Sequence, residues 1–159
     1  MPLRKLDRST EDALVDAALR ARLRAYAPYS NFLVGAALIA DDGTVVDGCN
    51  VENASYGLCI CAERTAISAA VSQGHLGVRA IAIATGSAPP SPPCGMCRQV
   101  LAEFSTDALI ILVNPEGGRV RTSLKKIFPG TFTKALLEKG RTSTKKNAKG
   151  ARVKKQGSR

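Results

Sequence analysis

The chain has 159 residues, of which 45% are hydrophobic, and its formal net charge is +10. This length suits one compact domain with its own core, and no apolar run approaches the ~18 residues that cross a bilayer. The N-terminus, M-P-L-R-K, turns charged at once and has no apolar segment of the secretory type. The composition therefore argues against a membrane-spanning protein and against a secretory signal.

The positive charge is concentrated at the C-terminal end. Subtracting the nine basic residues from Lys139 onward from the total of 23 leaves 14, against 13 acidic residues, in positions 1–138. Residues 140–159 are poor in apolar side chains and cannot offset the entropy of folding. We therefore expect one domain at 1–138 and a basic, disordered tail at 139–159. Such a tail is most simply a solvated one, and weak, salt-sensitive contact with nucleic acid is the alternative.

The first predicted elements are a helix and a hairpin. The helix covers residues 10–26: Thr10 can cap it, and apolar side chains at 14, 17, 18 and 21 recur at helical spacing. Pro28 cannot continue a helix and should end it. The apolar segment 32–40, a D-D-G turn and the segment 44–51 predict two antiparallel strands.

The rest of the domain alternates between helix and strand. We predict helices at 61–74 and 94–104, buried strands at 78–85 and 108–114, an edge strand at 118–123, and a helical turn with a loop at 124–132. This alternation implies parallel pairing at the centre of the sheet, and the hairpin makes the sheet mixed. The predicted fold class is α/β: three layers, α/β/α, around a mixed, roughly five-stranded sheet.

Two cysteine motifs stand at the starts of predicted helices, C-A-E-R at 61–64 and P-C-G-M-C-R at 93–98. Helix N-termini present free N–H groups, which favour thiolate over thiol. Cys61, Cys94 and Cys97 could supply three corners of a zinc tetrahedron and leave the fourth for water, as in a catalytic site. Cysteines in such close spacings suit a cytoplasmic protein better than a secreted disulfide scaffold.

Glu63 lies two residues after the first candidate ligand. Its carboxylate can take a proton from a metal-activated water and deliver it to a substrate. Zinc deaminases combine such a non-ligand glutamate with a P-C-x-x-C motif. A lone C-x-x-C also fits a redox pair or a structural zinc module, in which Cys59 would be the fourth ligand. The order C-x-E, helix, strand, P-C-x-x-C favours catalytic zinc over both.

From about Thr10 to Phe132 the chain resembles the small, homotetrameric, zinc-dependent cytidine deaminases of nucleoside salvage. The matching segments are A-Y-A-P-Y-S-N-F-L-V-G-A-A-L (25–38), G-C-N-V-E-N-A-S-Y (48–56), C-A-E-R-T-A (61–66), S-P-P-C-G-M-C-R-Q-V (91–100) and P-G-T-F (129–132). The resemblance implies one Zn²⁺ per subunit on Cys61, Cys94 and Cys97, with Glu63 as the proton shuttle. It also implies a homotetramer with shared active sites.

The resemblance assigns further residues to substrate and metal. Asn50 and Glu52 would bind the ribose hydroxyls, Phe32 would pack on the pyrimidine, Phe132 would reach a neighbouring subunit's pocket, and Arg64 would donate to the thiolates. Residues 50 and 52 of a strand face the same side, which independently suits one sugar edge. A guanidinium would also offset the negative charge of three thiolates on zinc.

Simpler alternatives remain for individual residues. Without the resemblance, Asn50 would be a turn or strand-end residue, and Phe32 could simply pack in the core. For Arg98, a structural ion pair stands beside donation to the thiolates as an alternative. We expect small buried side chains for Cys49 and Cys59, and an exposed His75 without a role.

The implied activity is hydrolytic deamination of cytidine and deoxycytidine to uridine and deoxyuridine with release of ammonia. Blasticidin-S-type deaminases share the zinc motifs but alter the ribose motif, so Asn50 and Glu52 favour a nucleoside. A polynucleotide cytosine deaminase is suggested by the basic tail alone. The predicted core offers no obvious insertion or basic groove for a strand.

Overall fold

The computed structural model describes residues 6–141. These residues belong to two compact units, and the boundary along the sequence falls between Pro129 and Gly130. In the second unit, residues 134–141 are helical. The predicted start of the tail falls inside this helix, and residues 142–159 lie outside the described residues, so the tail stays a prediction. Within residues 6–141, no helix has the length and apolar character needed to span a bilayer.

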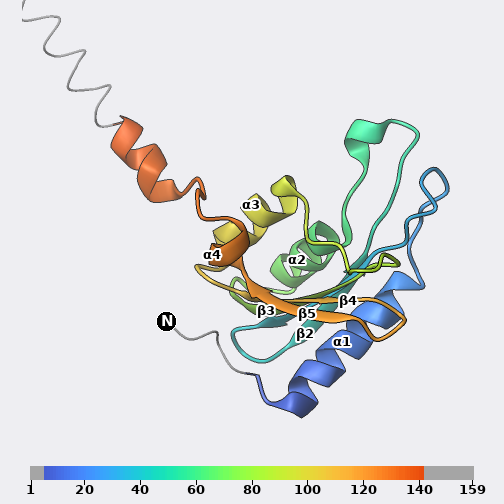
Figure 1. The fold of residues 1–159 in the computed structure, drawn as a ribbon. Helices are drawn as coiled ribbons and strands as arrows, with labels where there is room; N and C mark the ends of the chain where they lie inside the picture. Colours follow the sequence, from blue (N-terminus) through green and yellow to red (C-terminus); the bar gives the residue numbers. More distant parts are fainter. Residues whose placement is uncertain (1–5, 142–159) are drawn as a thin grey trace, which may run out of the picture. The chain divides into compact units, whose positions relative to one another are not determined.

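A mixed five-stranded sheet forms the centre of the first unit, in the order β2-β1-β3-β4-β5 (Figure 1). Its strands are β1 (Gly35–Ala40), β2 (Val45–Cys49), β3 (Val78–Ala84), β4 (Leu109–Val113) and β5 (Arg119–Ser123). The predicted hairpin is the antiparallel pair β1 and β2, and β5 is an edge strand as expected. The predicted parallel pairing at the centre of the sheet is found between β3 and β4. β2 does not pair with β3, because β1 lies between them and is antiparallel to both.

Helices cover both faces of this sheet, which confirms the predicted fold class. α1 (Arg8–Arg22) lies on one face, and α2 (Ala62–Ser72) and α3 (Gly95–Phe104) lie on the other (Figure 1). The short helix α4 (Leu124–Ile127) follows β5. Strand side chains alternate between the two cores. Those that face α1 include four alanines, Ala37, Ala80, Ala82 and Ala84, whereas larger residues such as Leu38, Ile81 and Ile83 face α2 and α3.

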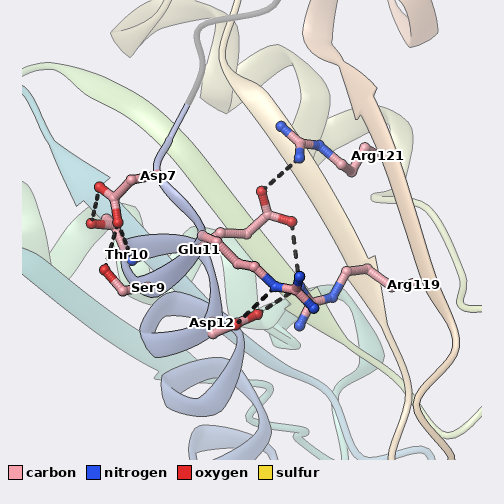
Figure 2. Close-up of polar contacts among 8 residues, drawn as sticks. Asp7, Ser9, Thr10, Glu11, Asp12, Arg119 and Arg121 are labelled. Atoms are coloured by element: carbon pink, nitrogen blue, oxygen red, sulfur yellow. Dashed lines mark hydrogen bonds and ion pairs between the residues drawn. The ribbon is translucent and has the colours of Figure 1, made fainter.

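The bounds of α1 differ from the prediction at both ends. Its N-cap is Asp7 rather than Thr10: one carboxylate oxygen accepts the Thr10 N–H at 2.9 Å, and the other accepts the Thr10 hydroxyl at 2.6 Å (Figure 2). Hydrogen bonds from Ser9 and Thr10 hold the pKa of the Asp7 carboxyl well below its usual range. The helix closes at Leu23, so Pro28 plays no part in ending it.

A buried carboxylate ties α1 to the edge strand β5. Glu11, only 4% exposed, lies 3.4 Å from Arg119 Nη1 and 2.9 Å from Arg121 Nη1 (Figure 2). Residues 119 and 121 point to the same side of the strand, so both guanidinium groups reach the helix. Asp12 also contacts Arg119, at 2.8 Å, but about half of its side chain is exposed.

Replacing Glu11 with alanine should lower the free energy of unfolding by about 2 kcal/mol, because two guanidinium groups lose their buried partner. The loss is smaller than for a fully buried pair, since both arginine side chains are more than a third exposed. Asp12→Ala is the matched control, and there the loss should stay below about 1 kcal/mol. Urea unfolding measures both values, and equal losses would contradict a special role for the buried carboxylate.

His75 has a partner, which the sequence did not indicate. Its Nδ1 lies 3.0 Å from a carboxylate oxygen of Asp42, and its side chain is 20% exposed. Asp41 N–H donates to Gly77 O nearby, at 3.2 Å. The expectation of a residue without a role was therefore wrong: His75 helps to join the α2–β3 loop to the β1–β2 turn.

Candidate active site

Three cysteine side chains converge at the N-termini of α2 and α3. Cys61 and Cys94 are the N-cap residues of these helices, and Cys97 lies in the first turn of α3. Their sulfur atoms all lie within 4.8 Å of one another, and those of Cys61 and Cys94 are 3.9 Å apart. Thiolates bound tetrahedrally to zinc at ~2.3 Å would be about 3.8 Å apart. Sulfur donors at this spacing fit a zinc ion.

The local fold also favours negative charge on these sulfurs. Neither N-cap side chain bonds to its own helix, so the positive N-termini of α2 and α3 face the cluster without another cap. A hydrogen bond from Cys97 lowers the pKa of Cys61 to about 5, and the same contact raises the pKa of Cys97. A cation bound to these sulfurs would displace the protons that they carry.

Two arginines support the cluster in different ways. Arg64 Nη2 donates to the Cys59 carbonyl at 2.9 Å and lies 3.9 Å from the Cys61 sulfur. Its Nε is buried and has no hydrogen-bond partner among the described residues, which suits a neighbouring centre of negative charge. Arg98 donates to the carbonyls of Pro93 and Ile127, both at 2.8 Å. These backbone contacts take the place of the ion pair considered for Arg98.

A cavity of about 330 Å³ opens beside the thiols, and Cys61, Cys94 and Glu63 are in its wall. Glu63 is only 5% exposed, and this burial raises the pKa of its carboxyl. A nearby cation would draw the same group back toward its ionised form. A carboxyl balanced in this way is suited to accept and to return a proton.

Asn50, Glu52 and Phe32 line the same cavity. Asn50 accepts the Val34 N–H at 2.8 Å and donates to the Phe32 carbonyl at 2.9 Å. Glu52 accepts the N–H groups of residues 29 and 30, at 2.9 and 3.2 Å, and also the hydroxyl of residue 30. These two polar side chains therefore hold the loop that carries Phe32.

Asn50 and Glu52 were predicted to face the same side because they would lie on one strand, and the structure differs slightly from this. β2 ends at Cys49, before either residue, but Val51 forms isolated bridges with Tyr26 and Ile60. The chain thus stays extended through Asn50 and Glu52, and both side chains reach the cavity.

Other predicted residues lie elsewhere or in unexpected places. Phe132 belongs to the second unit and is 58% exposed, so its role stays a prediction. Cys59 is half-buried and lines the cavity instead of packing in the core. Cys49 is also half-buried, and its thiol donates to the Arg24 carbonyl at 3.4 Å.

Several residues of the cavity wall did not stand out in the sequence. They are Ser30, Val34, Ile60, Ile83, Thr85, Ser91 and Pro92. Thr85 could have been found from its position, because it directly follows β3, and ligand sites tend to form beyond the carboxyl ends of parallel strands. Ile83 belongs to β3 itself, and most of the others belong to loops whose path the sequence does not predict.

Comparison with known proteins places this site in a family. Residues 8–113 match the family described as cytidine and deoxycytidylate deaminase zinc-binding region. The chain is 45% identical over 127 residues to a cytidine deaminase of Sporosarcina psychrophila, covering 79% of this chain and 93% of the relative. It is 49% identical over 121 residues to a cytidine deaminase of Halalkalibacterium halodurans, covering 76% and 92%.

Solved structures agree with these relatives. The crystal structure of cytidine deaminase from Burkholderia pseudomallei aligns with a TM-score of 0.73 and 49% identity, over 76% of this chain and 98% of that chain. Cytidine deaminase from Mycobacterium tuberculosis aligns with a TM-score of 0.68 and 40% identity, over 81% and 99%. The chain belongs to the cytidine and deoxycytidylate deaminase family of zinc-dependent hydrolytic enzymes.

Proposed function

We propose that this chain deaminates free cytidine and deoxycytidine, yielding uridine or deoxyuridine and ammonia, as a pyrimidine salvage enzyme. The observation that carries the proposal is one cavity whose wall brings together the buried Glu63 carboxyl and the polar pair Asn50 and Glu52. Two thiols of the three-cysteine cluster, Cys61 and Cys94, lie in the same wall. The names of the relatives support the same reaction.

In this proposal Cys61, Cys94 and Cys97 hold the zinc, and Glu63 moves the protons. Bound zinc would make water acidic enough to act as a nucleophile at neutral pH. Glu63 accepts a proton from that water and delivers it to ring N3. The oxygen of that water would bond to C4 as N3 is protonated. Glu63 would then carry the second proton of the water to the amino group as the bond from C4 to nitrogen breaks, so that water is consumed and ammonia leaves.

Asn50, Glu52 and Phe32 bind the nucleoside in this scheme. The first two already hold the loop around Phe32. The Asn50 amide still has a second N–H, and the Glu52 carboxylate, which accepts three hydrogen bonds, keeps about one lone-pair site for a ribose hydroxyl. Phe32 is 42% exposed, so its ring has a free face for a pyrimidine. Arg64 stays beside the thiolates, as its contact with Cys61 supports.

Activity assays on the zinc-loaded protein test the function. Cytidine and deoxycytidine should lose ultraviolet absorbance as product forms, whereas blasticidin S and a single-stranded oligonucleotide that contains cytosine should turn over at least ~10²-fold more slowly. Turnover of the oligonucleotide without turnover of cytidine would contradict the proposal and favour a polynucleotide deaminase. Turnover of blasticidin S without turnover of cytidine would also contradict the proposal and would favour a blasticidin-S-type deaminase.

We also propose that the enzyme is a cytoplasmic homotetramer with shared active sites, in which Phe132 completes a neighbour's pocket. Large apolar side chains in the segments 26–32 and 51–60 are exposed, including Tyr26, Tyr56 and Leu58 at 58, 73 and 65%. Exposed apolar groups of this kind are typical of interfaces. Light scattering should give about four times the chain mass of 16.7 kDa, and a monomer would contradict the shared site.

A further inference from the structure

Three hydroxyl groups form a hydrogen-bonded chain in the loop that leads to Cys94. Thr85 Oγ1 lies 3.1 Å from Ser87 Oγ, which lies 2.7 Å from Ser91 Oγ. The Ser91 N–H also donates to Thr85 Oγ1, at 3.0 Å, so the three residues close a ring. Asn114, which directly follows β4, donates to the Ser87 carbonyl at 3.1 Å and holds the ring against the sheet.

The two ends of this hydroxyl chain reach the cavity. Thr85 and Ser91 line it together with Cys94 and Glu63, whereas Ser87 does not. Thr85 is only 3% exposed, so its position is set by packing as well as by hydrogen bonds. Ser91 stands three residues before Cys94, and both residues line this cavity.

The number of protons on the three hydroxyls decides whether the hydroxyl chain can donate a hydrogen bond to a ligand in the cavity. The three hydroxyls carry three protons, but only two O–H···O hydrogen bonds link them to one another. If both links run in one direction, the third proton sits on Thr85 or on Ser91, in the cavity wall. If both ends donate to Ser87, the Ser87 proton has no acceptor among the hydrogen bonds of the described residues, which is unfavourable for a half-buried hydroxyl. The two one-way arrangements interconvert by rotation of the hydroxyls.

We propose that Ser91 contacts the substituent at C4 of the pyrimidine and that the hydroxyl chain reverses as substrate becomes product; this rests on the proposed function. The amino group of the substrate donates hydrogen bonds, and Ser91 accepts one while its own proton points to Ser87. The C4 oxygen of the product accepts hydrogen bonds, and Ser91 donates to it when the chain runs the other way. Thr85 and Ser87 are positioning residues that make both directions available.

Kinetics of three variants test this role. Ser91→Ala should lower kcat/KM for cytidine and weaken inhibition by uridine, each by about 3- to 10-fold, the value of one neutral hydrogen bond. Ser91→Thr, which keeps the hydroxyl, should recover most of both losses. Ser87→Ala keeps the Ser91 hydroxyl but breaks its chain, and the loss should be about 2- to 3-fold. Ser72→Ala, whose hydroxyl bonds to Ala69 O on the exposed side of α2, is the matched control and should be unchanged.

The outcomes separate this role from a purely structural one and from failure of the proposed function. Wild-type inhibition by uridine in Ser91→Ala, with or without a lower unfolding temperature, would overturn the contact at C4. A weakened uridine inhibition at an unchanged unfolding temperature and zinc content would support it. Absence of cytidine turnover in the wild-type enzyme would instead contradict the proposed function itself.

Discussion

Replacing Glu63 with glutamine should lower kcat for cytidine at least about 10³-fold while the protein keeps its zinc. Glutamine has nearly the same shape as glutamate, so the buried side chain can keep its place, but an amide cannot accept and return a proton. The substitution leaves all three sulfur ligands in place, so the metal site should be retained. Absorbance assays give kcat, and metal analysis of the same sample gives zinc per chain.

The matched control for this variant is Glu103→Gln, an exposed glutamate of α3 that is outside the cavity wall. It removes the same charge and should retain wild-type turnover. Turnover of Glu63→Gln within tenfold of wild type would remove Glu63 from the proton-transfer role. Loss of zinc together with activity would point to a ligand role for Glu63 instead, because a proton shuttle has no bond to the metal.

The features that sequence predicts well are those in which local pattern and chemistry coincide. Cys61 and Cys94 both precede helical segments, and each becomes an N-cap. A helix N-terminus favours the thiolate form that a metal binds. The two cysteine motifs therefore predict both the position of these residues in the fold and their role as ligands. The sequence also predicts the strands and their places in the sheet. The continuous apolar run of β4 is buried throughout, whereas the polar sequence of β5 suits a partly exposed edge strand.

Features that depend on distant contacts could not be predicted in the same way. Glu11 and Arg119 are 108 positions apart, and neither has a neighbour in sequence that suggests the other. The separation of β2 from β3 by β1 is a choice between sheet orders that the same string of elements allows. The Ser91 N–H reaches the Thr85 hydroxyl only because the loop folds back on the end of β3, and loop paths of this kind leave little trace in composition.

The close approach of α1 to β1 leads to the second large effect: Gly35→Ala should lower the free energy of unfolding by about 3 kcal/mol or more. A Cβ at position 35 would lie 2.7 Å from Arg22 Cα and still closer to Ala18 O and Arg22 N. These are backbone atoms of α1, which no side-chain rotation can move. The helix would have to shift from the alanine-lined face of the sheet, and dispersion contacts along that interface would be lost.

The same shift would reach the active site, because Arg22 Nε donates to the Leu33 carbonyl at 3.1 Å, next to Phe32. We therefore expect Gly35→Ala to raise KM for cytidine under conditions in which the variant remains folded. Gly130→Ala is the control, since a Cβ there meets no atom within 4 Å, and its unfolding free energy should stay within about 0.5 kcal/mol of wild type. Urea unfolding followed by circular dichroism measures both variants. A wild-type midpoint for Gly35→Ala would mean that α1 can move away from β1 at little cost, and the alanine face would then not require the close packing described above.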